Sequence, residues 1–88
     1  MHKLIIAQSF LEDLAELPEN VVEAVWAELG VVGEFPGVGS SLLEPYFRNS
    51  YGPQCLKVAV CGYDVLYRRR DDQGEVHVLG VVPQRCMR

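Results

Sequence analysis

The chain has 88 residues, of which 49% are hydrophobic and 23% are charged. This length and balance are ordinary for a soluble globular protein, and they exclude collagen-like repetition and intrinsic disorder. We expect residues 1–88 to form one domain. The apolar run near the N-terminus is too short for a signal peptide or a membrane span, so a cytoplasmic protein without membrane contact is expected. Neither a metal site nor a cofactor is expected, because no C-x-x-C pair occurs among the three cysteines, Cys55, Cys61 and Cys86.

The formal net charge of −4 is unevenly distributed along the chain. Residues 1–45 contain one basic and eight acidic side chains, whereas residues 46–88 contain seven basic and four acidic ones. The sequence therefore predicts an acidic half and a basic half. A basic surface can hold phosphates or an acidic segment of a partner, and the alternative is a mixed, solvated surface.

The first half of the chain predicts a strand followed by two helices. The segment KLIIAQ, Lys3 to Gln8, is rich in strand-forming residues. Ser9 and Glu12 have the spacing of a capping box, which predicts a helix that begins at Ser9 and ends near Pro18. An apolar stripe with spacings of four, four and three residues predicts a second helix, from residue 19 or 20 to Glu34. These helices are expected to form an antiparallel pair that covers a sheet.

The second half predicts three strands in antiparallel succession. Gly37 to Gly52 is expected to be a loop, because glycine, serine, proline and asparagine recur there. A strand is expected over Gln54 to Val60, followed by a tight turn at Cys61-Gly62. The arms 63–70 and 75–82 then form a hairpin, closed by DDQG with a positive φ at its glycine. Apolar residues occur on both parities of the second arm, so both of its faces are expected to be covered. The prediction is an α+β fold, strand-helix-helix-strand-strand-strand, with a curved antiparallel sheet and the two N-terminal helices packed on one face.

This order, the segment LKVAVCGYDVLYRRRDDQGEVHVLGVVPQR at residues 56–85 and the helix segment at residues 17–36 resemble the RelE/ParE superfamily of bacterial toxins. The resemblance implies the toxin of a type II toxin-antitoxin system of the plasmid-stabilisation kind, neutralised by a cognate antitoxin. The RelE-like branch comprises ribosome-dependent endonucleases that cut mRNA and thereby inhibit translation. The ParE-like branch inhibits DNA gyrase. Whether this chain is an enzyme therefore depends on the residues of the site.

The resemblance also implies where a nuclease site would lie. RelE-like nucleases present a lysine on the second strand, an arginine directly after the Gly-Tyr of the third, and an arginine past the fourth. Lys57 and Arg85 match the first and third positions as catalytic residues. The second position is Asp64, an anion where a cation is expected. We expect Asp64 to share a face with Lys57, to pair with it and to repel phosphate.

These matches favour a ParE-like toxin that acts on a protein target such as DNA gyrase. One alternative is a ribosome-dependent endonuclease with a rearranged site, in which Arg48, Lys57, Arg68 and Arg85 hold phosphate. Another is a degenerate family member that has lost toxicity. Arg48, Arg68 and Arg70 are the candidates for binding phosphate or a partner. The alternative for the arginine run at 68–70 is a solvated strand end, balanced by the acidic residues Asp71, Asp72 and Glu75.

Overall fold

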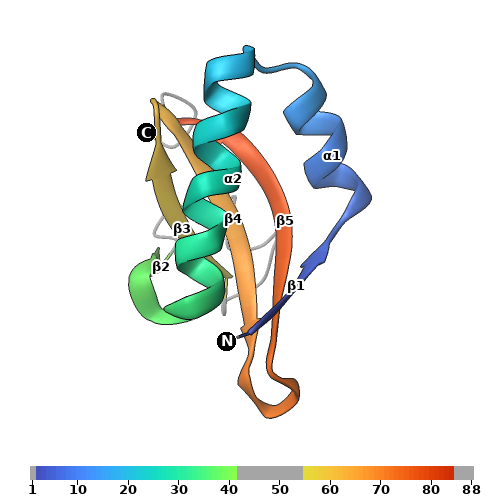
Figure 1. Cartoon of the computed structure of the whole chain (residues 1–88), viewed down its shortest axis with the longest axis vertical. Helices are drawn as coiled ribbons and strands as arrows, with labels where there is room; N and C mark the ends of the chain where they lie inside the picture. The colour runs from blue at the N-terminus through green and yellow to red at the C-terminus, as the bar shows by residue number, and fades with distance from the viewer. Residues whose placement is uncertain (1, 42–54, 85–88) are drawn as a thin grey trace.

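The computed structural model describes residues 2–41 and 55–84. Two helices lie on one face of a single curved sheet, which is the predicted α+β arrangement (Figure 1). Neither helix is long and apolar enough to cross a membrane. The elements in chain order are β1 (Lys3–Ile6), α1 (Gln8–Ala15), α2 (Glu19–Glu34), the 3-10 helix η1 (Pro36–Val38), β2 (Ser40–Ser41), β3 (Cys55–Val60), β4 (Tyr63–Arg70), the 3-10 helix η2 (Asp71–Gln73) and β5 (Glu75–Pro83).

The sheet has the strand order β1-β5-β4-β3-β2. The antiparallel pairing of β3, β4 and β5 confirms the predicted succession. The first strand joins in the other sense, because β1 runs parallel to β5, with Lys3 opposite Glu75 and Ile6 opposite Val78 (Figure 1). A parallel neighbour requires a long crossover connection, and the chain between β1 and β5 provides one. The predicted antiparallel sheet thus extends from β2 to β5 and gains a parallel edge.

The first helix begins without the predicted capping box. Ala7 occupies the position before α1, and no side chain caps that helix. Ser9 lies inside α1, where its hydroxyl donates a hydrogen bond to the carbonyl oxygen of Leu79 on β5 at 2.6 Å. The capping-box prediction was wrong because a partner distant in sequence engages the serine. The second helix, Glu19–Glu34, has the predicted bounds.

The stretch predicted as a loop contains short regular elements. The 3-10 helix η1 follows α2 directly, and Ser40–Ser41 pairs with β3 at Leu56 and Lys57. The loop prediction was therefore wrong for residues 40–41. The remainder of that stretch, residues 42–52, lies outside the described residues.

The hairpin of β4 and β5 closes as predicted, with Gly74 at φ +64°. Its pairing shifts by one residue, because Leu66 lies opposite Gly80 while Tyr67 lies opposite Val78. Leu79 is therefore the extra residue of a β-bulge. Beyond the bulge, the side chains of β5 alternate in the opposite phase between the two faces of the sheet. This bulge accounts for the irregular alternation of the second arm. Val81 joins Val76 and Val78 in the core beneath the helices, and Val82 packs on the opposite face, so both faces of this arm are covered as predicted.

The main core lies between the helices and the sheet. It combines side chains of α1 and α2 with those of β3, β4 and β5 that face the helices. Tyr67 of β4 is fully buried there, and its hydroxyl joins the segment after α2 to the sheet. That hydroxyl donates to the carbonyl oxygen of Pro36 at 2.7 Å and accepts from the amide of Gly39 at 2.9 Å. A smaller cluster lies on the opposite face of the sheet and consists of Cys55, Leu66, Leu79 and Val82.

Candidate functional site

The face of the sheet opposite the helices brings together the first predicted site residues. Cys61 and Gly62 form the predicted two-residue turn, at φ +50° and +84°, and Val60 pairs with Tyr63 across it. This register places Ala59 opposite Asp64 and Lys57 opposite Leu66. Because side chains alternate between the faces of a strand, Lys57 and Asp64 lie on the same face. The predicted shared face is confirmed.

Lys57 and Asp64 form the ion pair that the sequence predicts. The Lys57 Nζ atom lies 3.9 Å from Asp64 Oδ2, and the side chain of Asp64 is 5% exposed against 25% for Lys57. The other carboxylate oxygen, Oδ1, accepts a hydrogen bond from Gln84 Nε2 at 3.3 Å. Gln84 was not predicted as a partner, and only the strand pairing brings it to Asp64. A phosphate that approached Lys57 would meet a fixed anion within the same contact distance, which opposes its binding.

The surroundings of this pair are apolar. Cys55 and Leu66 are buried beside it, in contact with Leu79 and Val82. Burial raises the pKa of the Cys55 thiol from 9.0 to about 11. The thiol therefore stays protonated near neutral pH and is a poor nucleophile. The cations in the described part of this face include Lys57, which is paired with Asp64, and Arg68, which lies opposite Cys55 and also has an interaction partner.

The arginines at the end of β4 lie against acidic residues of the hairpin tip. Arg69 Nη2 lies 2.9 Å from Asp71 Oδ2, and Arg70 Nε lies 3.9 Å from Asp72 Oδ1. Arg68 also has an interaction partner. At Arg69 and Arg70 these contacts favour the alternative of a balanced strand end over a free phosphate site. The other two predicted site residues, Arg48 and Arg85, lie outside the described residues.

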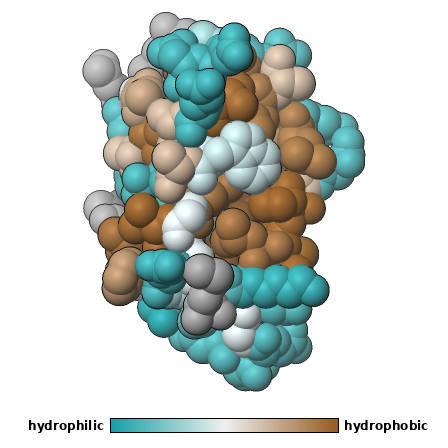
Figure 2. All heavy atoms as spheres, viewed as in Figure 1, coloured by the Kyte–Doolittle hydropathy of each residue, from teal (hydrophilic) through white to brown (hydrophobic). Residues whose placement is uncertain are grey.

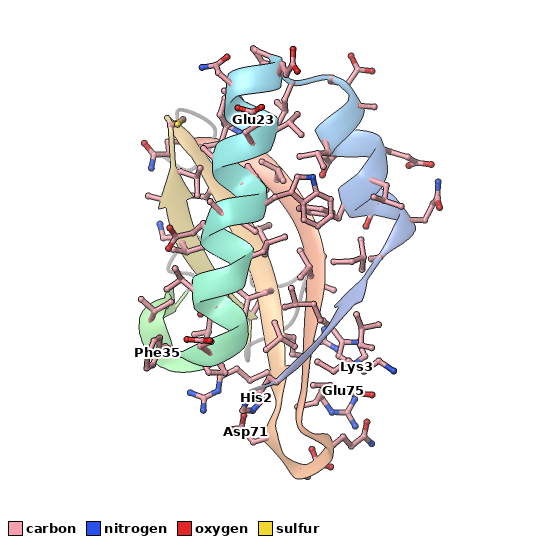
Figure 3. The ribbon with its side chains drawn as sticks, viewed as in Figure 1. His2, Lys3, Glu23, Phe35, Asp71 and Glu75 are labelled. Atoms are coloured by element: carbon pink, nitrogen blue, oxygen red, sulfur yellow. The ribbon has the colours of Figure 1, made fainter. Side chains whose placement is uncertain are left out.

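The hairpin tip is also joined to the N-terminal strand. His2 Nε2 lies 2.9 Å from Asp71 Oδ1, and both residues are seen close together beside the hairpin (Figure 3). Hydrogen bonds from His2 and then from Arg69 lower the pKa of the Asp71 carboxyl. On the neighbouring strand β5, His77 Nε2 lies 3.0 Å from Glu75 Oε1. The charges of this end of the molecule are thus largely engaged with one another.

A second candidate surface, an apolar groove, lies on the helix layer. An open groove of about 430 Å³ runs between α1 and α2. Trp26 of α2 lies next to it in an edge-to-face contact with Phe10 of α1, with ring centroids 5.6 Å apart. Figure 2 shows apolar atoms gathered over this face, with hydrophilic atoms at its two ends. The groove is lined by Leu11, Leu14, Ala15, Leu17, Glu19 and Val22.

The same helices are acidic. Residues 8–34 contain seven acidic side chains and no basic one. Asp13 is used internally, since its Oδ2 atom accepts a hydrogen bond from the Val81 amide at 3.0 Å. Among the described residues, no ion pair involves the exposed carboxylates of this layer, Glu12, Glu16, Glu19, Glu23 and Glu34.

Comparison with known proteins finds similarity in structure. No protein-family model matches the chain, and no curated protein sequence matches it. The toxin-antitoxin complex RelBE of E. coli contains a similar chain, with a TM-score of 0.75 and 24% identity, covering 94% of this chain and 96% of that one. A RelBE complex from Mycobacterium tuberculosis gives 0.77 and 23%, covering 93% and 96%. An E. coli RelE mutant in complex with a peptide of the antitoxin RelBc gives 0.73 and 24%, covering 93% and 82%. The chain therefore has the fold of RelE toxins, as the sequence predicts.

Proposed function

We propose that this chain belongs to the RelE/ParE superfamily, is the toxin of a type II toxin-antitoxin system, and acts by binding a protein target. DNA gyrase is the target that the ParE-like branch of the superfamily implies. The fold shared with RelE toxins, three of them in complexes with an antitoxin or its peptide, supports the toxin-antitoxin assignment. The observation that carries the choice of a protein target is the buried carboxylate of Asp64 beside Lys57.

Chemistry on an RNA phosphate needs fixed cations or hydrogen-bond donors where negative charge develops. The loss of one such donor lowers the rate of an enzyme by about 10²–10³. Here the strand position expected to hold an arginine holds Asp64, which already engages Lys57 at 3.9 Å and Gln84 at 3.3 Å. The acidic helices add a second obstacle, because phosphate contacts dominate affinity for nucleic acids. Both features favour a protein over RNA as the target.

A ribosome-dependent mRNA endonuclease is the second candidate. The similar solved structures are RelE chains, and Lys57 lies on the expected face with a quarter of its side chain exposed. In this alternative Lys57 and Arg85 are catalytic, and Arg48 and Arg68 hold phosphate. A substrate phosphate would have to draw Lys57 away from Asp64.

Induced expression in a bacterial host distinguishes these activities. We expect growth arrest with DNA breaks and intact mRNA, because the proposed target is DNA gyrase and the chain does not cut RNA. Lys57→Ala should leave the arrest unchanged, and Lys3→Ala, which alters the other lysine of the chain, is its matched control. New mRNA 5′ ends within codons that vanish in Lys57→Ala and Arg85→Ala would establish the endonuclease instead. Unimpaired growth at good expression would contradict toxicity altogether.

A further inference from the structure

We propose that the groove between α1 and α2 binds a basic amphipathic helix of a partner protein. The groove lies in the helix layer, on the face of the sheet opposite the Lys57–Asp64 pair. The inference rests on the proposed function in one respect, since it specifies the chemistry of the antitoxin segment that such a toxin would bind.

The walls of the groove have the composition of an interface core. Leu11 of α1 is 43% exposed and Trp26 of α2 is also 43% exposed, although both are large and apolar. Trp26 lies one helical turn after Val22, which lines the groove, and its ring reaches across to Phe10 of α1. An exposed tryptophan beside an apolar hollow is typical of the residues that dominate binding energy at protein interfaces.

The shape and lining of the groove favour a helix over a small ligand. Sites for small molecules combine an apolar lining with several convergent polar groups. Here Glu19 is the one charged residue of the lining, and the other five lining residues are apolar. Two helices that diverge over a sheet leave a groove that a third helix can fill with residues at spacings of three and four. Figure 1 shows α1 and α2 on the same side of the sheet, and Figure 2 shows apolar atoms gathered on this face.

The charges beside the groove determine which charge the partner helix should carry. Both helices that form the groove are acidic, and no basic residue occurs between positions 8 and 34. A second copy of the chain would bring these carboxylates against their equivalents, and RNA would bring phosphates against them. A helix with lysines or arginines beside an apolar stripe satisfies both the groove and its rim, and complementary charge accelerates its association. Glu19 lines the groove, and the exposed Glu12, Glu16 and Glu23 directly follow its lining residues Leu11, Ala15 and Val22 in sequence. These four carboxylates form the rim, and Glu23 is labelled in Figure 3.

The test uses the full chain and a synthetic helical peptide of leucine, alanine and lysine, with leucines at helical spacing and lysines beside them. Trp26 is the single tryptophan of the chain and lies one helical turn after Val22 of the groove lining, so its fluorescence is the probe for a helix bound there. We expect saturable binding with a blue shift of the emission, about tenfold tighter than for the same peptide with glutamate at each lysine position. A scrambled peptide of equal composition should also bind about tenfold more weakly. Binding of the lysine peptide should weaken as salt is added.

Two pairs of variants locate the binding. Glu23→Lys and Glu34→Lys make the same charge change at exposed positions of α2, about 16 Å apart along the helix axis. We expect Glu23→Lys to weaken the lysine peptide about tenfold and Glu34→Lys less than about twofold, because this separation exceeds the Debye length of about 8 Å. Leu11→Ala should weaken binding about fivefold, whereas Val38→Ala, at an exposed apolar residue outside the groove, should leave it unchanged. Circular dichroism establishes that each variant is folded.

Several outcomes would overturn the proposal. Equal affinity for the lysine and glutamate peptides would show that the groove does not select a basic partner. Equal effects of Glu23→Lys and Glu34→Lys would show that the peptide does not bind at the groove. A dimer that buries Trp26 and is strengthened by Glu23→Lys would assign the groove to a second copy. The growth assay and the binding assay test different proposals. If the chain binds the peptide but does not arrest growth, the groove proposal stands and the toxin assignment is refuted. If the chain arrests growth but does not bind the peptide, only the groove proposal is refuted.

Discussion

The hydroxyl of Tyr67 makes the polar contacts that are best suited to a test, because it lies within the core and connects two segments distant in sequence. It donates to the carbonyl oxygen of Pro36 at 2.7 Å and accepts from the amide of Gly39 at 2.9 Å. The side chain is fully buried, and burial raises the pKa of its hydroxyl. Tyr67→Phe removes this hydroxyl and leaves the packing of the ring in place. The change isolates the two hydrogen bonds.

The expected loss follows from the groups left without partners. A buried carbonyl oxygen without a donor costs about 1–3 kcal/mol, and the half-buried Gly39 amide, which water can reach, adds about 0.5–1 kcal/mol. We therefore expect Tyr67→Phe to lower the free energy of unfolding by about 2–3 kcal/mol. At this chain length each kcal/mol lowers the melting temperature by about 4–8 °C. Urea unfolding followed by Trp26 fluorescence and circular dichroism measures the change.

Tyr63→Phe is the matched control. Tyr63 lies on the same strand and faces the same core, and its hydroxyl makes no hydrogen bond to any residue that the structure describes. We expect this control to change the free energy of unfolding by less than about 0.5 kcal/mol. A Tyr67→Phe variant as stable as Tyr63→Phe would refute the reasoning, because the two backbone groups would then have found other partners at no cost.

Three further predictions concern single contacts, each measured by urea unfolding. Lys57→Met should cost about 1–2 kcal/mol, because it leaves Asp64 buried without a cation, and a double-mutant cycle with Asp64→Asn should show favourable coupling; additive losses would contradict the pair. Ser9→Ala should cost about 0.5–1.5 kcal/mol and Glu12→Ala less than about 0.5 kcal/mol, whereas a larger loss for Glu12→Ala would restore the capping box. The raised pKa of Cys55 means that the unfolded chain releases its thiol proton first, so stability should fall by up to about 2–3 kcal/mol as the pH rises from 9 to 11. Cys55→Ala should lose most of that slope, and an unchanged slope would contradict its origin in this thiol.

Much of the fold could be predicted because local signals and tertiary packing agree. The spacing that located α2 is the spacing of its buried residues Val21, Val25, Leu29 and Val32. The turn at Cys61-Gly62 fixes the register of β3 against β4, since a slip of one residue would move every side chain to the other face. The pairing of Lys57 with Asp64 follows from that register. Helix α2 and the Lys57–Asp64 pair could therefore be predicted because each depends on residues close in sequence.

The features that sequence reasoning missed depend on distant partners. Ser9 has the residue type and spacing of a cap, but a carbonyl on β5 competes for its hydroxyl. The bulge at Leu79 is invisible in an alternating pattern, because two residues on one strand oppose one on the next. The groove was missed for another reason: apolar residues at helical spacing do not show which of them the second helix covers, and here Leu14 is buried whereas Leu11 stays exposed.

The structure changes what the charge of the sequence implies about a partner. Among the described residues of the basic half, Lys57, Arg69 and Arg70 each lie against a carboxylate of the same half, and Arg68 also has an interaction partner. The acidic half differs, since the exposed carboxylates of α1 and α2 make no ion pair within the described residues. A partner therefore meets an acidic, apolar helix layer on one face, and on the described part of the other face it meets Lys57 paired with Asp64. Such a surface attracts a basic protein segment and repels phosphate, which is the same preference that Asp64 imposes at the centre of the sheet.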